Sequence, residues 1–541
     1  MIGETGSLAT LPRVAARLRW GMRLAVFAAL LCGFHGGPRT ATAAAPGTPV
    51  RGEEAPESTS QNPNGGEAAN PGTPHGLLKL TIAKAIEVML ERSPPTEIAF
   101  LRRQIDKKNF EVAMKEFDPR WTVTAGTTQS SNYNRTNDTR DASANSRTGL
   151  GATMKVPLGG SFVLAWGGTK AQGIGESPND VGITYDLSYT QPLLRGAGTD
   201  VGLANQVMAQ RSEVTSLLTL KGTLIGAVSA VIQACRALML NKRQLEISQN
   251  SLERSRDLLR INKALVEAGR MPAMDLVQVE GDLASRELAL RAEENRLDNA
   301  RITLLQLLGL DIKSQIDLAT DLALPEVTLD QAASTRKAFA SSPDYLSAEI
   351  ALDNARTALM LARNGMLWDL ALTARTAIAG QATTEGNAYR NASAYKENNR
   401  SVDLSLSIPL NDPSREQAKA NALVGLRQAE VSLQQLKDTI PLRIQDKIRE
   451  IQLTKAQIEL ARRALELTER KLKIEEDRLK AGRSTNFQYL SFQNDLLNAQ
   501  LNEIQVVVAY QNALDDLESL QGTTLEKWGI RLERDVQLPE R

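Results

Sequence analysis

The sequence predicts a fold in which very long α-helices are joined to short strands of the transmembrane β-barrel type. Residues 200–268 and 416–481 contain scarcely a helix breaker, and at ~1.5 Å per residue such helices reach on the order of 100 Å. Six short segments elsewhere alternate apolar and polar residues, which is the periodicity of strands. Both features occur twice in the same order, so we expect a duplicated chain of helix, strands, long helix, tip and return helix.

Composition excludes several function classes. Aromatic residues make up 4% of the 541, which is typical of extended helical assemblies rather than thick globular cores. The formal net charge of +1 gives no basic field for nucleic acid. Two cysteines and two histidines provide neither a disulfide framework nor a metal or acid/base cluster. Because no phosphate loop or nucleophile motif is found either, we expect no enzyme, no cofactor and no metal.

The first 76 residues resemble an export signal followed by a linker. Four arginines precede the apolar run 24–34, and small residues suited to signal peptidase follow at 40–46. Eleven apolar residues are too few to cross ~30 Å of hydrocarbon. We therefore assign 1–45 to a signal peptide and 46–76 to a disordered linker rich in Pro, Gly and Ser. Two questions stay open, namely whether translation starts at Met22 and whether Cys32 carries a lipid, which Leu31 before it argues against.

The six alternating segments are 121–129, 149–157, 161–169, 182–190, 368–378 and 401–409. Either a soluble sheet or a transmembrane barrel with its polar face toward a water-filled lumen has this pattern. The barrel is favoured because the helices are too long to cover one small sheet and because aromatic residues lie near strand ends. Open edges are not tolerated in lipid, so barrel strands require other copies of the chain. The polar connectors 131–146 and 381–399 are expected to be solvent loops.

The helices show the pattern of coiled coils with turns at their ends. Ile458, Leu465, Leu472 and Leu479 recur every seven residues. Both long helices end in Ala-Gly-Arg, where Gly269 and Gly482 suit the left-handed position after a helix, so each marks the tip of a helical hairpin. The offset of 213 residues persists to Gly309 and Gly522. Shorter helices, 81–116 and 329–364, precede the strands, and the repeats are assigned to 77–325 and 326–541.

Several motifs, by their order and duplication along the chain, resemble those of the TolC-type outer membrane efflux proteins from about residue 80 onward. They are LTIAKAIEVMLERSPP (80–95), QPLLRGAG (191–198), its counterpart IPLNDPSRE (408–416) and the two Ala-Gly-Arg tips. The resemblance implies a homotrimer in a Gram-negative bacterium, with strands pooled into one barrel in outer membrane lipid and helices pooled into a periplasmic tube. It also implies that the tips meet the periplasmic adaptor (membrane fusion) protein of an inner membrane transporter.

The family commonly has four strands per protomer, whereas this chain offers an extra hairpin at 149–169. Three copies would then form a twelve-stranded barrel with an appendage or an eighteen-stranded barrel. Because the hairpin alternates like its neighbours, eighteen is favoured. The resemblance also places swivels, where lipid-embedded strands turn into the helical tube, at Pro192, Gly196, Gly198, Pro409 and Pro413.

The resemblance assigns the tip, gate and adaptor-docking residues to Gly269, Arg270, Asp275, Gly482, Arg483, Gln488 and Ser491. Asp275 matches an aspartate that holds neighbouring tip helices together in the family. Gln488 and Ser491 occupy the positions of an acidic constriction, so that three-fold rings here would be neutral and closure would depend on hydrogen bonds and on packing of Phe487 and Tyr489. Arg483 could pair with Asp275; alternatively, Arg270 and Arg483 are solvated charges near a helix C-terminus.

The predicted function is a passive exit duct of the outer membrane. The alternative is a periplasmic coiled-coil adaptor or scaffold, which fits the hairpins but not the strands. The cargo, whether drug, metal or protein, and the class of pump stay open, because the residues expected in the lumen carry no single sign: Lys155, Asp186, Asp369, Arg375 and Asp403.

Overall fold

The structure is a computed structural model that describes residues 78–134, 139–174, 180–269, 272–318, 324–325, 327–395, 397–481 and 483–532. All of them belong to the compact unit Thr73–Arg541. The predicted signal peptide and linker, together with Arg270 and Gly482, lie outside the described residues.

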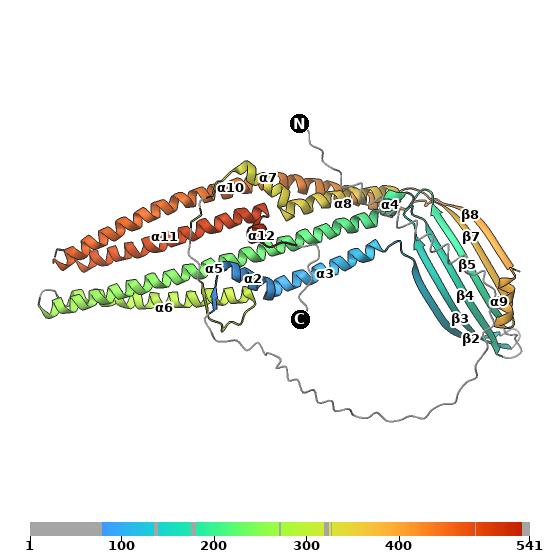
Figure 1. The fold of residues 1–541 in the computed structure, drawn as a ribbon, viewed down its shortest axis with the longest axis horizontal. Coiled ribbons are helices and arrows are strands. Elements are labelled where there is room, and N and C mark those ends of the chain that lie inside the picture. Colours follow the sequence, from blue (N-terminus) through green and yellow to red (C-terminus); the bar gives the residue numbers. More distant parts are fainter. Residues whose placement is uncertain are drawn as a thin grey trace, which may run out of the picture. The chain divides into compact units, whose positions relative to one another are not determined.

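The elements of the first half are β1 (Leu78–Leu80), α2 (Ile82–Arg92), α3 (Pro94–Met114), β2 (Arg120–Asn134), β3 (Thr139–Lys155), β4 (Ser161–Ile174), β5 (Asp180–Pro192), α4 (Thr199–Gly202), α5 (Ala204–Glu267), α6 (Met274–Leu308) and β6 (Ile316–Leu318). The second half contains α7 (Gln331–Ser341), α8 (Pro343–Gly365), β7 (Asp369–Ala382), α9 (Glu385–Ser393), β8 (Glu397–Ser407), α10 (Pro413–Lys480), α11 (Asn486–Gln521) and α12 (Thr524–Lys527). The long helices run side by side and the strands continue from one end of them (Figure 1).

The two Ser-Pro sequences join helix pairs in the same way. Pro94 and Pro343 are the first residues of α3 and α8, where a missing N–H costs nothing. Gly309 and Gly522 end α6 and α11 at φ values of 67° and 72°. A Cβ atom at these glycines would lie 2.4 Å from the Arg92 oxygen and 2.5 Å from the Ser341 oxygen, respectively. Each return helix therefore ends against a Ser-Pro joint, and only glycine fits there.

One antiparallel sheet has the strand order β2-β3-β4-β5-β7-β8. Trp166 lies opposite both Leu150 and Tyr185, and Tyr185 lies opposite Ile378, so these side chains share an apolar face. The opposite face carries Gly, Ser and Thr with a few charged residues. The alternation predicted from the sequence is confirmed. The extra hairpin at 149–169 belongs to this ladder and is not an appendage.

Both predicted solvent loops are shorter than expected, because strands and a helix occupy parts of them. Strand β2 continues to Asn134 and β3 begins at Thr139, with Thr127 opposite Ser146 and their hydroxyl oxygens 3.3 Å apart. In the second connector, β7 runs to Ala382, α9 follows, and β8 begins at Glu397. Polar composition was a poor guide to the strand ends, because the hydrogen bonds between strands are formed by the backbone. Ser, Thr and Asn can therefore extend a strand as long as the neighbouring strand continues.

Helix α9 packs on the apolar face of the sheet. Its Ala388 and Ala392 are buried together with Val181 and Ile183. A Cβ atom at Gly380 of β7 would lie 2.3 Å from the Ala388 oxygen, so the close approach of α9 requires glycine there. The two alanines, four residues apart, are the sequence signal for this helix.

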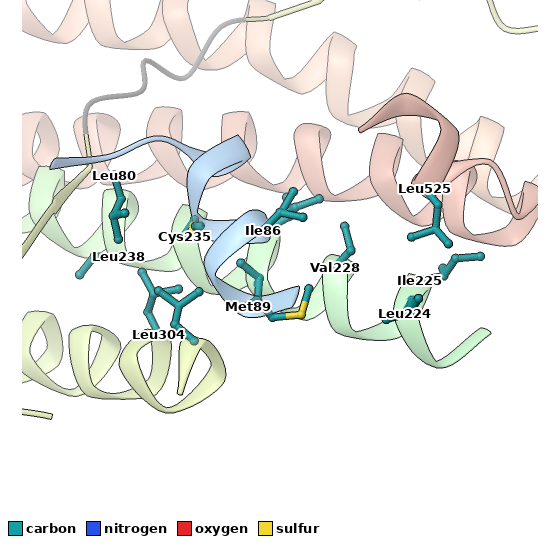
Figure 2. Close-up of a cluster of buried hydrophobic side chains, with 14 of the residues drawn as sticks. Leu80, Ile86, Met89, Leu224, Ile225, Val228, Cys235, Leu238, Leu304 and Leu525 are labelled. Atoms are coloured by element: carbon teal, nitrogen blue, oxygen red, sulfur yellow. The ribbon is translucent and has the colours of Figure 1, made fainter. Parts of the chain in front are cut away.

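The largest core surrounds the middle of α5, where α2, α6 and α12 converge (Figure 2). Leu224, Val228 and Cys235 of α5 belong to the same buried cluster as Met89 of α2 and Leu304 of α6. Among the described residues, α5 is the one helix that is long and apolar enough to cross a membrane, with a window of mean hydropathy 1.7. Because 44% of that window is buried, its apolar character is explained by this core.

Candidate functional site

The first hairpin tip lies between α5 and α6. Gly269 has a φ of 69° and its N–H donates to the Val266 oxygen at 2.9 Å, which is the left-handed ending predicted for the helix. Beyond the tip, the two helices are tied by weak exposed ion pairs, between Lys263 and Glu280 at 4.0 Å and between Arg256 and Glu287 at 3.5 Å. The helices thus form an antiparallel hairpin.

The second tip lies between α10 and α11. The Arg483 N–H donates to the Arg478 oxygen at 2.9 Å, and the Thr485 hydroxyl caps α11 by accepting from the Gln488 N–H at 3.3 Å. Lys471 pairs with Asp495 farther along the hairpin, at 3.0 Å. Both predicted hairpins are therefore present.

The predicted gate residues lie on the exposed surface of these tips. Asp275 occupies the first turn of α6, where a carboxylate is favoured by the helix dipole. Gln488 and Ser491 are exposed on α11, and Arg483 is exposed beside the tip. Among the ion pairs of the described residues, none joins Arg483 to Asp275 within the chain. Any bond between these two side chains must therefore involve a second copy or another state.

The two aromatic residues at the second tip differ. Phe487 is 71% exposed, whereas Tyr489 is 7% exposed and packs with Leu258 of α5 and Val279 of α6. Burial raises the pKa of the Tyr489 hydroxyl. The expectation that both rings serve channel closure is corrected for Tyr489, which packs inside the protomer between the hairpins.

A buried polar seam joins the two hairpins. The Asn262 amide of α5 donates to the Asn486 side-chain oxygen of α11 at 3.1 Å. On α6, Arg286 donates to Asn494 of α11 and pairs with Asp282. Sequence reasoning missed this seam, although polar residues at buried coiled-coil positions, which fix register, were the available signal.

At the first strand-to-helix junction, the chain turns through the predicted glycines. Pro192 ends β5, and Gly196 and Gly198 have φ values of 80° and 98°. The Gly196 N–H donates to Asn364 Oδ1 at 2.7 Å, and the Gly198 N–H donates to the Leu158 oxygen at 3.2 Å. Positive φ explains why glycine occupies both positions.

The second junction uses different chemistry. Pro409 follows β8, and Pro413 is the first residue of α10. Asp412 caps α10 by accepting from the Ser414 N–H at 3.1 Å, and its hydrogen bonds with Ser414 lower the pKa of the Asp412 carboxyl. The turn is completed by Asn411 at a φ of 60°.

One carboxylate connects both junctions. Asp369, the first residue of β7, lies 3.2 Å from Arg195 of the first junction and 2.9 Å from Arg415 of the second. Arg415 also donates to the Leu367 oxygen at 2.9 Å. Asp369 was expected to be a lumen residue only, and its place in this clamp was missed because the partners are far apart in sequence.

Two ion pairs involve charges on the polar face of the sheet. Arg375 donates to Asp186 at 2.6 Å, and Lys155 donates to Glu116 at 2.9 Å. Within the described ranges, no group of three or more His, Cys, Asp and Glu is arranged to hold a metal ion. The arrangement offers a polar sheet surface, two exposed hairpin tips and two hydrogen-bonded junctions.

Comparison with known proteins finds a matching family and structures of similar fold. Residues 334–523 match the model of the outer membrane efflux protein family. The fold is similar to the CmeC outer membrane channel of Campylobacter jejuni, with 15% identity, a TM-score of 0.64, and coverage of 82% of this chain and 86% of that chain. The open state of the MtrE outer membrane channel of Neisseria gonorrhoeae has 14% identity, a TM-score of 0.60 and coverage of 82% and 89%. No curated protein matches the sequence significantly.

The VceC outer membrane protein of Vibrio cholerae is similar over 83% of this chain and 96% of its own, with 15% identity and a TM-score of 0.60. At this identity the structural likeness supports the fold, and the family match carries the function. The resemblance to TolC-type outer membrane efflux proteins is confirmed, and so is the predicted role as an efflux channel of the outer membrane extending into the periplasm. The alternative of an adaptor or scaffold is not supported. The family and the similar structures are channels rather than enzymes.

Proposed function

We propose that three copies of this chain close into a passive exit duct whose tips dock on the adaptor of an inner membrane transporter. The observation that carries this proposal is an apolar stripe on α10. Leu453, Leu460, Leu467 and Ile474 recur every seven residues, and each is between 56% and 66% exposed. A heptad stripe of large apolar residues requires a partner helix, since one left in water forfeits the free energy of burial.

The complementary edge lies on the other side of the protomer. Helix α10 packs mainly on α8 and α11, whereas α3 and α6 pack mainly on α5. Helix α3 exposes Ile98, Ile105 and Val112 at heptad spacing, and α6 exposes Leu288 between the small residues Ser285 and Ala292. Both edges therefore expose large apolar side chains that a single chain leaves uncovered. In a ring of copies, α10 of each would pack against α3 and α6 of the next.

The sheet also has two edges that are unpaired within one chain. Strands β2 and β8 are its edges, and Val123 and Val402 on them are 80% and 75% exposed on the apolar face. Pairing β8 of one copy with β2 of the next removes every edge, as lipid requires. Three copies of the six-stranded sheet would form an eighteen-stranded barrel. Barrel diameter grows roughly linearly with strand number, and barrels of this size leave an aqueous channel.

At the opposite end, the hairpin tips would form the gate. Gly269, Arg270, Gly482 and Arg483 mark the proposed docking surface, while Asp275, Gln488 and Ser491 would line the closed tip. Asp275 and Arg483 are exposed and unpaired with each other in one chain, which suits a bond between neighbouring copies. Docking of the adaptor would shift the equilibrium between a closed and an open arrangement of the tips. The transporter would supply the energy for export.

The proposed division of labour follows the two repeats, 77–325 and 326–541, each contributing strands, one junction and one tip. The glycine- and proline-bearing junctions would act as the swivels between barrel and tube. The duct would perform no chemistry on its cargo and hold no cofactor. Paired charges on the polar face give no preference for cationic or anionic cargo.

Channel recordings test this function. The purified protein in a planar bilayer should form pores of low conductance, because the tips close them, and Asp275→Ala should raise the conductance several-fold. Asp344→Ala, in the first turn of α8 and far from the tips, is the matched control and should leave conductance unchanged. A wild-type protein that forms no pores would contradict the duct. An Asp275→Ala pore identical to wild type would remove Asp275 from the gate.

A further inference from the structure

Arg254 occupies an unusual place in the seam between the two hairpins. It lies on α5, two turns before Asn262, and its Nε and Nη2 atoms are buried without a hydrogen-bond partner among the described residues. The ionisable groups that act on Arg254 are the Tyr489 hydroxyl and the Arg286 guanidinium, not a carboxylate. A buried guanidinium normally pairs with an anion, because desolvating an isolated charge is costly.

The amide of Gln493 is the second unpartnered group in the seam. Gln493 is 1% exposed, and both of its side-chain polar atoms lack a hydrogen bond with normal geometry, although the Tyr489 hydroxyl is close by. Helices α5 and α11 run antiparallel past the Asn262–Asn486 bond, so Arg254 and Gln493 lie at the same level, two turns farther from the tip. The Tyr489 hydroxyl interacts with the Gln493 amide and with the charge of Arg254.

A second positive charge approaches the same point. Arg286 of α6 is 7% exposed, donates to Asn494 next to Gln493, and is neutralised by Asp282. Asp282 in turn accepts from the Ser255 hydroxyl at 2.9 Å, so this carboxylate is fully engaged. Asp282 thus neutralises Arg286, whereas no ion pair among the described residues neutralises Arg254, whose Nε and Nη2 atoms are buried.

We propose that a small inorganic anion of the halide class binds between the Arg254 guanidinium and the Gln493 amide. The guanidinium nitrogens and the amide N–H are donors, and the Tyr489 hydroxyl supplies a third. A water molecule satisfies donors but leaves the excess charge in place. A halide does both, and its single-atom size suits a closely packed seam between helices. The proposal involves residues of one chain only and does not depend on the duct function.

Anion binding would stabilise the joint between the hairpins by mass action. The melting temperature of the full-length detergent-purified protein should therefore be higher in sodium chloride or bromide than in sodium gluconate at equal ionic strength, by about 2 °C or more. Bromide-soaked crystals should show an anomalous peak between Arg254 and Gln493. Equal melting temperatures together with no peak would overturn the proposal, as would a carboxylate of a second copy seated at Arg254.

Two variants separate the site from general salt effects. Gln493→Leu removes the amide donor and should abolish the bromide peak and the chloride-dependent shift. Arg254→Gln should do the same. Arg256→Gln is the matched control, because Arg256 lies on the same helix, is 61% exposed and pairs with Glu287, so it should keep both. Where Arg254→Gln fails to fold, wild type and Gln493→Leu decide the question; a chloride shift retained in Gln493→Leu would contradict the assigned site.

Discussion

The core around α5 and the outer edge of α10 both consist of apolar side chains, but those of the core are buried and those of the edge are exposed. Val228 and Ile232 of α5 are fully buried by helices of the same chain. Leu460 and Leu467 of α10 are more than half exposed, although they repeat as regularly as any coiled-coil seam. The first region is completed by one chain, and the second is completed only by another copy.

This difference shows which parts of the molecule are packed within a single chain and which need a second copy. The core and the Ser-Pro joints are packed within the chain, and the Asp369 clamp of the strand-to-helix junctions pairs within it. The α10 stripe, the α3 and α6 edge and the two edge strands are not packed in this way. Assembly and folding should therefore respond to different substitutions, and each of the following predictions tests that separation.

The largest effect is expected from charging the exposed stripe. Leu460→Glu with Leu467→Glu should abolish assembly, because burying an unpaired carboxylate costs more than the roughly 2–7 kcal/mol of an unpaired neutral polar group. The measurement is the molecular mass of the purified protein by light scattering, with helix content from circular dichroism. Lys473→Glu, an exposed position on the same helix, is the control and should assemble normally. Trimers formed by the double variant would disprove the role of the stripe.

The next effect should come from the α5 core. Leu304→Ala removes a side chain that is 0% exposed and should cost about 2–5 kcal/mol through lost burial and cavity formation. Calorimetry should therefore show a melting temperature lower by about 5 °C or more, while the protein still assembles below that temperature. If this variant instead dissociates into folded protomers, the two regions are not independent.

A smaller effect is expected at the junction clamp. Asp369→Asn weakens the pairs with Arg195 and Arg415, but Asp369 is 41% exposed, so solvent screening limits the loss to about 1 kcal/mol or less. Limited proteolysis at 193–198 should become faster while the melting temperature changes little. Unchanged proteolysis would indicate that backbone bonds alone hold the junction.

The last prediction is that the buried Cys235 thiol does not react with an alkylating reagent in the folded protein. Burial raises the pKa of the Cys235 thiol to about 12, so at pH 8 the group is the neutral thiol and not the reactive thiolate. Mass spectrometry of the Cys235 peptide should show no alkylation in folded protein and complete alkylation after denaturation. Ser491→Cys, exposed at the tip, is the control and should react at once. Alkylation of native Cys235 would mean that the core opens readily.

The sequence predicted the parts of the fold that depend on local pattern. Breaker-free runs identified α5 and α10, alternation identified all six strands, and the Ala-Gly-Arg turn identified Gly269 as a left-handed ending. Its failures share a cause. Helix α9, the clamp of Asp369 and the seam of Asn262 and Arg286 depend on partners that only the folded chain brings together. Composition and spacing do not reveal such pairings.

For the gate, the sequence located the tips but not the state of their side chains. Asp275 and Arg483 are exposed near the tips, and no ion pair of the described residues joins them within one chain. Tyr489, which the sequence assigned to packing at the channel closure together with Phe487, is buried in a cluster with Leu258 of α5. A site formed by symmetry is only partly visible in a single protomer.

The most direct test of the central claim is a cross-link between the two edges. Ion pairs along each hairpin and the Asn262–Asn486 bond place Leu467 and Ala292 at the same level on opposite edges of the protomer. A Leu467→Cys, Ala292→Cys chain on a Cys235→Ser background should oxidise to a covalent product of three chains, because the closed ring leaves no free edge. Chains that remain single, or products that continue beyond three, would contradict the account.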